Sequence, residues 1–222
     1  MTEESQTLDQ TLDQTLNKTD FGHVINENKK PILVAGVVFL LAIAAFSIYK
    51  NQSGKAYQTQ LEQAFVFETE VLAAYNDGKI KTDDFLIKVK AMPSDIKGSN
   101  TLVPALFVSL DKLVEEGKTT EAIVILESWK PSFAKGTFMS YFIGLKLLPL
   151  LEDTNAYDKS IDLLTDLIAS KIEISKGKMY LDLGRIYLKK GDKVKADENF
   201  QFVIDNHKDT EFAKLANLYL GK

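Results

Sequence analysis

One uncharged apolar stretch near the beginning of the chain limits what the rest can be. Residues 31 to 49, PILVAGVVFLLAIAAFSIY, form 19 positions without a charged side chain. At about 1.5 Å of rise per residue, a helix of this length nearly matches a hydrocarbon core of about 30 Å. Pro31 falls in the first turn, where helices tolerate proline, and Tyr49 and Lys50 suit the interface with water. The stretch predicts a transmembrane helix over residues 31–49.

A cleaved signal peptide is the competing interpretation, because Ala42-Ile43-Ala44 offers an A-x-A cleavage site. A signal peptide begins with a short, positively charged segment. Here about thirty residues precede the apolar run, and they carry the acids Glu3, Glu4, Asp9, Asp13, Asp20 and Glu27. The sequence therefore favours a retained anchor over a cleaved leader.

The lysines on either side of the anchor suggest its orientation. Lys18, Lys29 and Lys30 precede it, and Lys50 and Lys55 follow it. Because positive charge accumulates on the cytoplasmic side, this excess of one lysine places the N-terminus in the cytoplasm and the C-terminal part outside.

The acidic tail, residues 1–30, contains the repeat TLDQ TLDQ TLNK. The repeat would place Leu8, Leu12 and Leu16 on one helical stripe, which could dock on a partner helix. A short segment rich in Thr and Asp is more often disordered alone. We predict a disordered cytoplasmic tail and keep the docking stripe as the alternative.

Composition argues against most enzymatic chemistry. The 222 residues include no Cys and two His, His23 and His207, one on each side of the anchor. Disulfides and thiolate zinc sites therefore have no cysteine from which to form, and two histidines on opposite sides of the anchor cannot share a metal site. The net charge of -4 lacks the basic excess of a nucleic-acid binder. We expect a non-enzymatic protein with no metal, no cofactor and no nucleic-acid partner.

Beyond the anchor the chain reads as helices separated by Gly, Pro and Asn/Asp breaks, with no convincing strand. Residues 50–98 predict a long juxtamembrane helix that ends at Asn76-Asp77-Gly78, and then a short helix with Thr82 as its N-cap. Asn51-Gln52-Ser53-Gly54 is the one plausible hinge beside the membrane.

Residues 177–210 resemble a tetratricopeptide repeat, a helix-turn-helix unit of 34 residues with small and aromatic residues at fixed offsets. The small residues Gly184 and Ala196 would let two antiparallel helices approach closely, and Gly191 falls in the turn. The larger positions of the pattern are occupied by Tyr180, Leu183, Tyr187 and Phe200.

Two further units fit the same frame less closely. Residues 103–136 carry Gly117 and Ala122 at the same five-residue spacing as Gly191 and Ala196. Residues 137–176 carry Gly144 at the small position and have an insertion around Glu152 to Ala156. The final helix would close the open end of the stack, as repeat arrays require. We predict an all-α fold, in which one N-terminal transmembrane helix precedes a tetratricopeptide-like α-solenoid over residues 99–222.

The segment GTFMSYFIGLKLLPLL, residues 136–151, is apolar on nearly every face of a helix. Such a helix is either buried in the core or displays a surface for a partner. In the repeat frame, its groove-facing residues would be Phe138, Tyr141, Phe142 and Leu145. The same positions in the last repeat are polar and typical of a solvated face: Lys178, Asp182, Arg185 and Lys189.

The order of these segments resembles the YfgM-like family of ancillary SecYEG translocon subunits. An acidic tail is followed by one anchor, by a long helix ending in AAYNDG, and by about three loose repeats. Agreement at the level of motifs lies in the generic repeat positions Gly117, Ala122, Gly184, Gly191 and Ala196. The resemblance implies a single-pass protein of the bacterial inner membrane with a periplasmic domain. Its partners would be Sec translocon subunits, a PpiD-like membrane-anchored chaperone and exported client proteins.

The resemblance also implies a function, namely assisting the handover of exported proteins on the periplasmic side of the Sec translocon. Two alternatives stay open. The chain could be a membrane-tethered scaffold of another envelope-assembly complex, or a regulator that acts through its acidic cytoplasmic tail.

Overall fold

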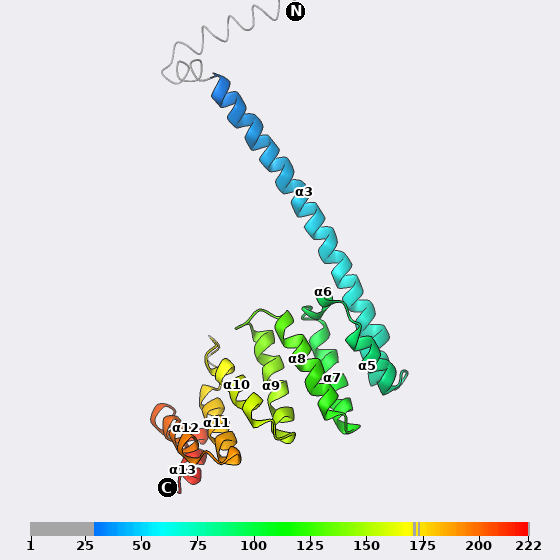
Figure 1. Cartoon of the computed structure of the whole chain (residues 1–222). Coiled ribbons are helices and arrows are strands. Elements are labelled where there is room, and N and C mark those ends of the chain that lie inside the picture. Colours follow the sequence, from blue (N-terminus) through cyan, green and yellow to red (C-terminus); the bar gives the residue numbers. More distant parts are fainter. Residues whose placement is uncertain (1–28, 171, 173, 222) are drawn as a thin grey trace, which may run out of the picture. The chain divides into compact units, whose positions relative to one another are not determined.

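The computed structural model describes residues 29–170, 172 and 174–221. Every regular element in these residues is a helix, so the prediction of an all-α chain is confirmed (Figure 1). The chain divides into two compact units, Met1–Thr59 and Gln60–Lys222. The predicted acidic tail and its TLDQ repeat lie outside the described residues, apart from Lys29 and Lys30.

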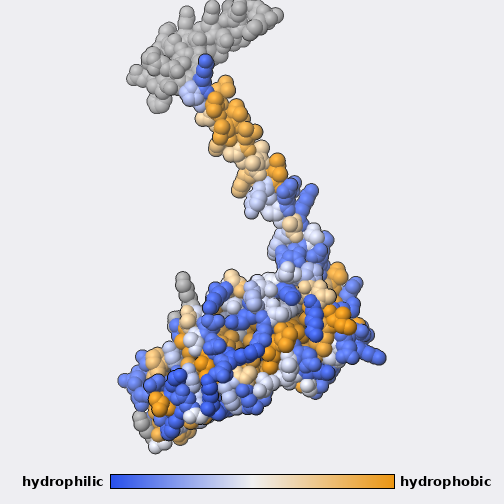
Figure 2. Space-filling model, in the orientation of Figure 1, coloured by the Kyte–Doolittle hydropathy of each residue, from blue (hydrophilic) through white to orange (hydrophobic). Residues whose placement is uncertain are grey.

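The first described element, α3 (Lys29–Phe67), is a single helix of 39 residues. Apolar side chains cover its N-terminal part, and large ones such as Leu33, Phe39 and Leu40 are exposed (Figure 2). α3 is long and apolar enough to cross a membrane, as the apolar stretch predicted.

The hinge expected at Asn51–Gly54 is absent, because α3 continues through these residues. The Ser53 hydroxyl donates to the carbonyl oxygen of Lys50 at 3.1 Å, a bond that fits inside a helix. A helical glycine costs about 1 kcal/mol relative to alanine, whereas ending one helix and starting another requires a new, unfavourable nucleus. The hinge prediction was wrong because a short polar run weakens a helix without ending it.

Beyond α3 the backbone makes a π-helical turn and several short helices. These are η1 (Glu68–Ala73), α4 (Ala74–Asn76), α5 (Thr82–Lys90) and α6 (Ser94–Lys97).

Tyr75, on α4, contacts α5 and the residue Glu116. Its buried ring stacks on Phe85 with ring centroids 4.0 Å apart, and its hydroxyl donates to Glu116 Oε2 at 3.0 Å. The hydroxyl of Thr82 donates to the same carboxylate oxygen. Lys81 occupies the N-cap position, so the prediction of Thr82 as N-cap was wrong. The Thr82 side chain serves a tertiary contact that local sequence does not reveal.

The Tyr75 phenol should make stability depend on pH at the alkaline end. Burial, opposed by the hydrogen bond with Thr82 and aided by Glu116, raises its pKa to about 12. In the unfolded chain the pKa is about 10. The folded state therefore holds this proton more tightly, and the associated stability is complete below about pH 10 and is lost as the pH rises towards 12.

We expect Tyr75→Phe to make the loss of stability above about pH 10 shallower than in the wild type, because the titrating hydroxyl is gone. Denaturant unfolding can be followed by the emission of the single, fully buried Trp129. Tyr57→Phe, at an exposed position, is the matched control and should leave the pH profile unchanged. Parallel wild-type and Tyr75→Phe profiles would contradict this role of Tyr75.

The remaining helices follow one another in three pairs and a final helix, and most of them pack mainly against their neighbours along the chain (Figure 1). A short turn, η2 (Lys130–Ser132), follows α8. The helices are α7 (Leu102–Glu115), α8 (Thr119–Trp129), α9 (Phe138–Asp153), α10 (Tyr157–Ile168), α11 (Lys176–Lys190), α12 (Lys193–Asn206) and α13 (Glu211–Tyr219). One pair falls in each of the ranges 103–136, 137–176 and 177–210 to within a residue or two.

Two glycines lie where helices approach closely. A Cβ on Gly184 would lie 2.5 Å from Cε1 of the Phe200 ring, a distance that real contacts do not reach. A Cβ on Gly144 would lie 2.9 Å from Cδ2 of Leu167. These glycines bring α11 onto α12 and α9 onto α10.

The other predicted packing positions contribute in different ways. Ala122, Ala196, Phe200 and Leu183 are buried. The ring of Tyr180 lies 4.0 Å from that of Phe202, and Lys195 Nζ lies 5.3 Å from the Tyr187 ring centroid. Gly117 and Gly191 follow α7 and α11 with φ of +75° and +88°, values that favour glycine.

Candidate functional site

α9 presents an apolar stripe to solvent on one side and fills the core with the other. Phe138, Phe142 and Leu145 are 59%, 47% and 37% exposed, and their spacing of four and three residues places them on one face. The opposite face is buried and includes Ile143, Leu147, Leu148 and Leu151. Thus one face of this helix lies in the core, and the other is exposed to solvent.

Tyr141 does not belong to the exposed stripe. Its side chain is 3% exposed, and its hydroxyl donates to the carbonyl oxygen of Ile174 at 2.7 Å. Burial also raises the pKa of this phenol. The prediction of Tyr141 as a groove residue was wrong, because the repeat frame fixes which helix it lies on but not the rotation of that helix. Tyr141 instead ties α9 to the segment before α11.

The only charged side chain inside the apolar run, Lys146, is held by neighbours. Its ammonium pairs with Asp111 on α7 and lies 5.6 Å from the centroid of the Phe107 ring. Both contacts join α9 to α7. The charge of Lys146 is therefore paired, and its contacts join this part of α9 to α7.

The polar residues of α11 form an ion-pair network in which Asp182 is buried, while Lys178 and Lys189 stay exposed. Asp182 is buried, and Arg185 Nη1 donates to its Oδ1 at 2.8 Å. Lys178 pairs with the other oxygen of this carboxylate. Arg185 and Lys189 also reach Glu152 on α9, at 3.6 Å and 3.1 Å. The prediction of a solvated stripe was wrong at Asp182, since a buried carboxylate needs these cations.

Arg185 stands at the centre of this network. Burial alone lowers the pKa of its guanidinium, but the carboxylates of Asp182 and Glu152 outweigh burial and raise it. The arginine is therefore charged at every physiological pH and joins α11 to α9 through Glu152. The stripe and the network together form the candidate protein-interaction surface.

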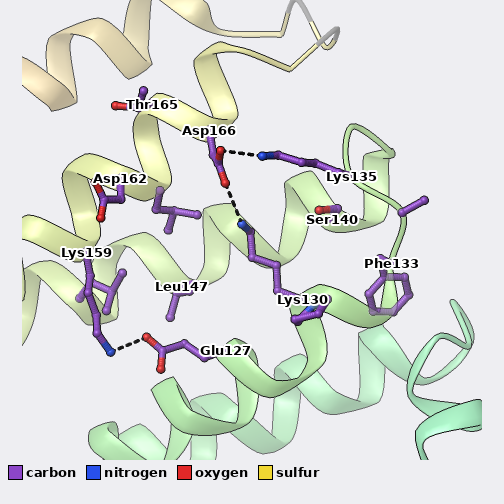
Figure 3. Close-up of a pocket in the computed structure, with 14 residues that line it drawn as sticks. Glu127, Lys130, Phe133, Lys135, Ser140, Leu147, Lys159, Asp162, Thr165 and Asp166 are labelled. Atoms are coloured by element: carbon purple, nitrogen blue, oxygen red, sulfur yellow. Dashed lines mark hydrogen bonds and ion pairs between the residues drawn. The ribbon is translucent and has the colours of Figure 1, made fainter.

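A separate cavity of about 840 Å³ lies among α8, η2, α9 and α10 (Figure 3). Apolar side chains, including Leu147, Leu163 and Phe133, contribute to its lining. Glu127 pairs with Lys159 at 2.7 Å, and Asp166 pairs with Lys135 at 2.9 Å and with Lys130 at 3.6 Å.

Lysines pair with two of the three acids that line this cavity, Glu127 and Asp166. The hydrogen bond from Lys135, aided by Lys130, holds the pKa of Asp166 below its usual range in spite of burial. The sequence did not predict this cavity. The only signal for it was the long loop with Pro131 and Gly136, which spaces α8 from α9.

The described residues contain no group of three or more His, Asp or Glu side chains that could hold a metal ion. Each carboxylate of the α9–α11 network is engaged by a cation, an arrangement suited to joining helices.

No protein-family model matches the chain, and no curated protein is similar to it. The resemblance to the YfgM-like family therefore stays an expectation from the order of the segments and the repeat positions.

Proposed function

We propose that this protein is a membrane-anchored, non-enzymatic scaffold that binds other proteins through the apolar stripe of α9. The observation that carries the proposal is the exposure of Phe138, Phe142 and Leu145 on a helix whose other face is core. Contiguous apolar side chains on the surface of a soluble unit favour a partner that covers them. We expect neither catalysis nor a cofactor.

The helical pairs support a tetratricopeptide-like solenoid as the architecture. The close approach at Gly184 and the glycine turns at Gly117 and Gly191 are features that such repeats require. Phe138, Phe142 and Leu145 would then line the groove that solenoids use to bind extended or helical segments.

The apolar part of α3 would tether this surface beside a membrane. Tethering raises the local concentration of a weak binding surface, so that partners exchange quickly and still find it. In the proposed arrangement the protein crosses the bacterial inner membrane once, with its N-terminus in the cytoplasm and residues 60–222 in the periplasm. The lysine bias around the anchor supports this orientation.

The partners proposed for the surface are Sec translocon subunits, a PpiD-like membrane-anchored chaperone and exported proteins that leave the channel. The segment order shared with YfgM-like proteins supports this choice. In this function the scaffold holds newly exported chains near the membrane until chaperones receive them.

Phe142→Asp tests the interaction surface in the full chain. A photo-reactive residue at position 145 would report contact with Sec subunits and with a stalled exported protein. We expect crosslinking to fall roughly tenfold or more, since burying a phenylalanine stabilises a contact by roughly 1.5 to 3 kcal/mol. Trp129 emission and the unfolding transition should stay as in the wild type, because Phe142 is exposed.

Val124→Asp on α8 is the matched control, because Val124 is equally exposed outside the stripe. It should crosslink as the wild type does. Unfolding of Phe142→Asp would instead assign this side chain to the core, and unchanged crosslinking by a folded variant would remove the stripe as the interaction surface.

A further inference from the structure

A groove that is separate from the α9 stripe and from the cavity of Figure 3 lies where the end of α3 and the η1 turn face the start of α6. It has a volume of about 470 Å³ and lies within residues 60–222. The Gln60 side chain donates to the carbonyl oxygen of Asp95 and so joins α3 to α6. The lining residues are Glu62, Gln63, Val66, Phe67, Glu70, Val71, Pro93 and Ile96.

The floor of this groove is apolar and open to solvent. Val71 and Ile96 are buried beneath it, and Phe67 is half-buried. Val66 is 48% exposed, and the neighbouring Phe65 is also exposed. Apolar surface in this arrangement gains free energy when another apolar side chain covers it.

The rim carries uncompensated negative charge. Glu62 and Glu70 are exposed, and neither carboxylate forms an ion pair or hydrogen bond with any residue that the structure describes. No basic side chain lines the groove. In the cavity of Figure 3, by contrast, two of the three lining acids, Glu127 and Asp166, are each paired with lysine. The groove beside α3 is therefore negatively charged, and no described residue of this chain neutralises that charge.

The groove wall is helical and contains the π-helical turn. Glu62, Val66 and Glu70 recur every four residues, so that they form a ridge about 12 Å long. Glu70 and Val71 belong to η1. π-helical turns are rare and are frequent at functional sites. Here the turn buries the consecutive residues Val71 and Leu72, while Glu70 stays on the open side.

We propose that this groove docks a short amphipathic helix of another protein, with an apolar face flanked by lysine or arginine. Its apolar side chains would cover Val66 and Phe67, and its cations would pair with Glu62 and Glu70. A helix is the favoured shape, because a helical ridge of about two turns packs well against another helix. The inference is independent of the α9 stripe, with which the groove shares no residue.

The test uses the full chain in nanodiscs of zwitterionic lipid and two labelled helical peptides. One peptide has leucines on one face flanked by lysines, and the other has the same leucines flanked by glutamates. We expect fluorescence anisotropy to detect binding of the lysine peptide only, weakened by added salt. Glu62→Lys combined with Glu70→Lys should reverse the preference, with a change of about tenfold or more for each peptide.

Two further variants separate docking from general attraction between charges. Val66→Asp should abolish binding of the lysine peptide while Trp129 emission stays as in the wild type. Glu115→Lys with Glu198→Lys makes the same charge change at exposed sites outside the groove and should bind as the wild type does.

The proposal is wrong if that control weakens binding as much as the groove variants do, or if Val66→Asp binds normally. It is also wrong if the lysine peptide does not bind and sedimentation finds a wild-type dimer that Val66→Asp converts to a monomer. In that case a second copy of the chain covers the groove.

Discussion

Replacing both Leu40 and Leu41 with arginine should release the protein from the membrane. Each arginine at the centre of a membrane helix costs roughly 2.5 to 3.5 kcal/mol, so the pair costs roughly 5 to 7 kcal/mol. Both leucines lie in the middle of the apolar part of α3 and are exposed in the isolated chain. We expect the wild type to remain in the membrane fraction after carbonate extraction and the double variant to appear in the soluble fraction.

Leu215→Arg with Leu218→Arg is the matched control for this result. These leucines are exposed on α13, so arginine there adds the same charge without touching the anchor. The control should stay in the membrane fraction. A wild-type chain that is soluble and lacks residues 1–44 would mean that the apolar stretch is a cleaved signal.

The same membranes can report orientation. An epitope placed after Lys222 should be lost when protease reaches the outer side of the inner membrane, while cytosolic proteins survive. Protection of the epitope would place the helical pairs in the cytoplasm and would exclude the proposed periplasmic function.

The second large effect concerns Gly184 and Phe200. Phe200→Ala should lower the free energy of unfolding by about 3 to 5 kcal/mol, because it opens a cavity at a fully buried ring. Gly184→Ala should cost about 1 to 3 kcal/mol, because its Cβ would collide with that ring. Denaturant unfolding followed by Trp129 emission measures both.

Combining the two changes tests the contact itself. Without the ring, alanine at position 184 has space and improves helix propensity by up to about 1 kcal/mol. We therefore expect Gly184→Ala to be neutral or stabilising in the Phe200→Ala background, which is a strong coupling in a double-mutant cycle. Additive costs would mean that Gly184 does not serve the approach of α11 to α12.

The sequence predicted the features that depend on residues close together along the chain, namely helices and turns. The apolar run predicted the N-terminal helix, and the three- and four-residue spacings predicted helices throughout. Gly117 and Gly191 predicted two of the turns, and both adopt positive φ. The family, the solenoid and the membrane orientation stay predictions, since they depend on partners or on the arrangement of whole helices.

The candidate site was predicted only in part. Phe142 and Tyr141 are neighbours in a segment that is apolar on every face, so periodicity could not tell which of the two is buried. The sequence predicted Asp182 to be a surface acid, whereas the structure buries it and pairs it with Arg185 and Lys178. The groove beside α6 was not predicted, because its walls are separated by more than twenty residues of chain.

The sequence by itself determined that this chain is helical, where a few of its helices end, and that one of them is apolar enough for a membrane. Those properties depend on backbone propensity and on apolar length, both of which are local. Only the tertiary structure decided which side chains of α9 face solvent, which acids are neutralised, and that Glu62 and Glu70 are not. Exposure and charge pairing depend on contacts between helices, and the rotation of each helix fixes those contacts.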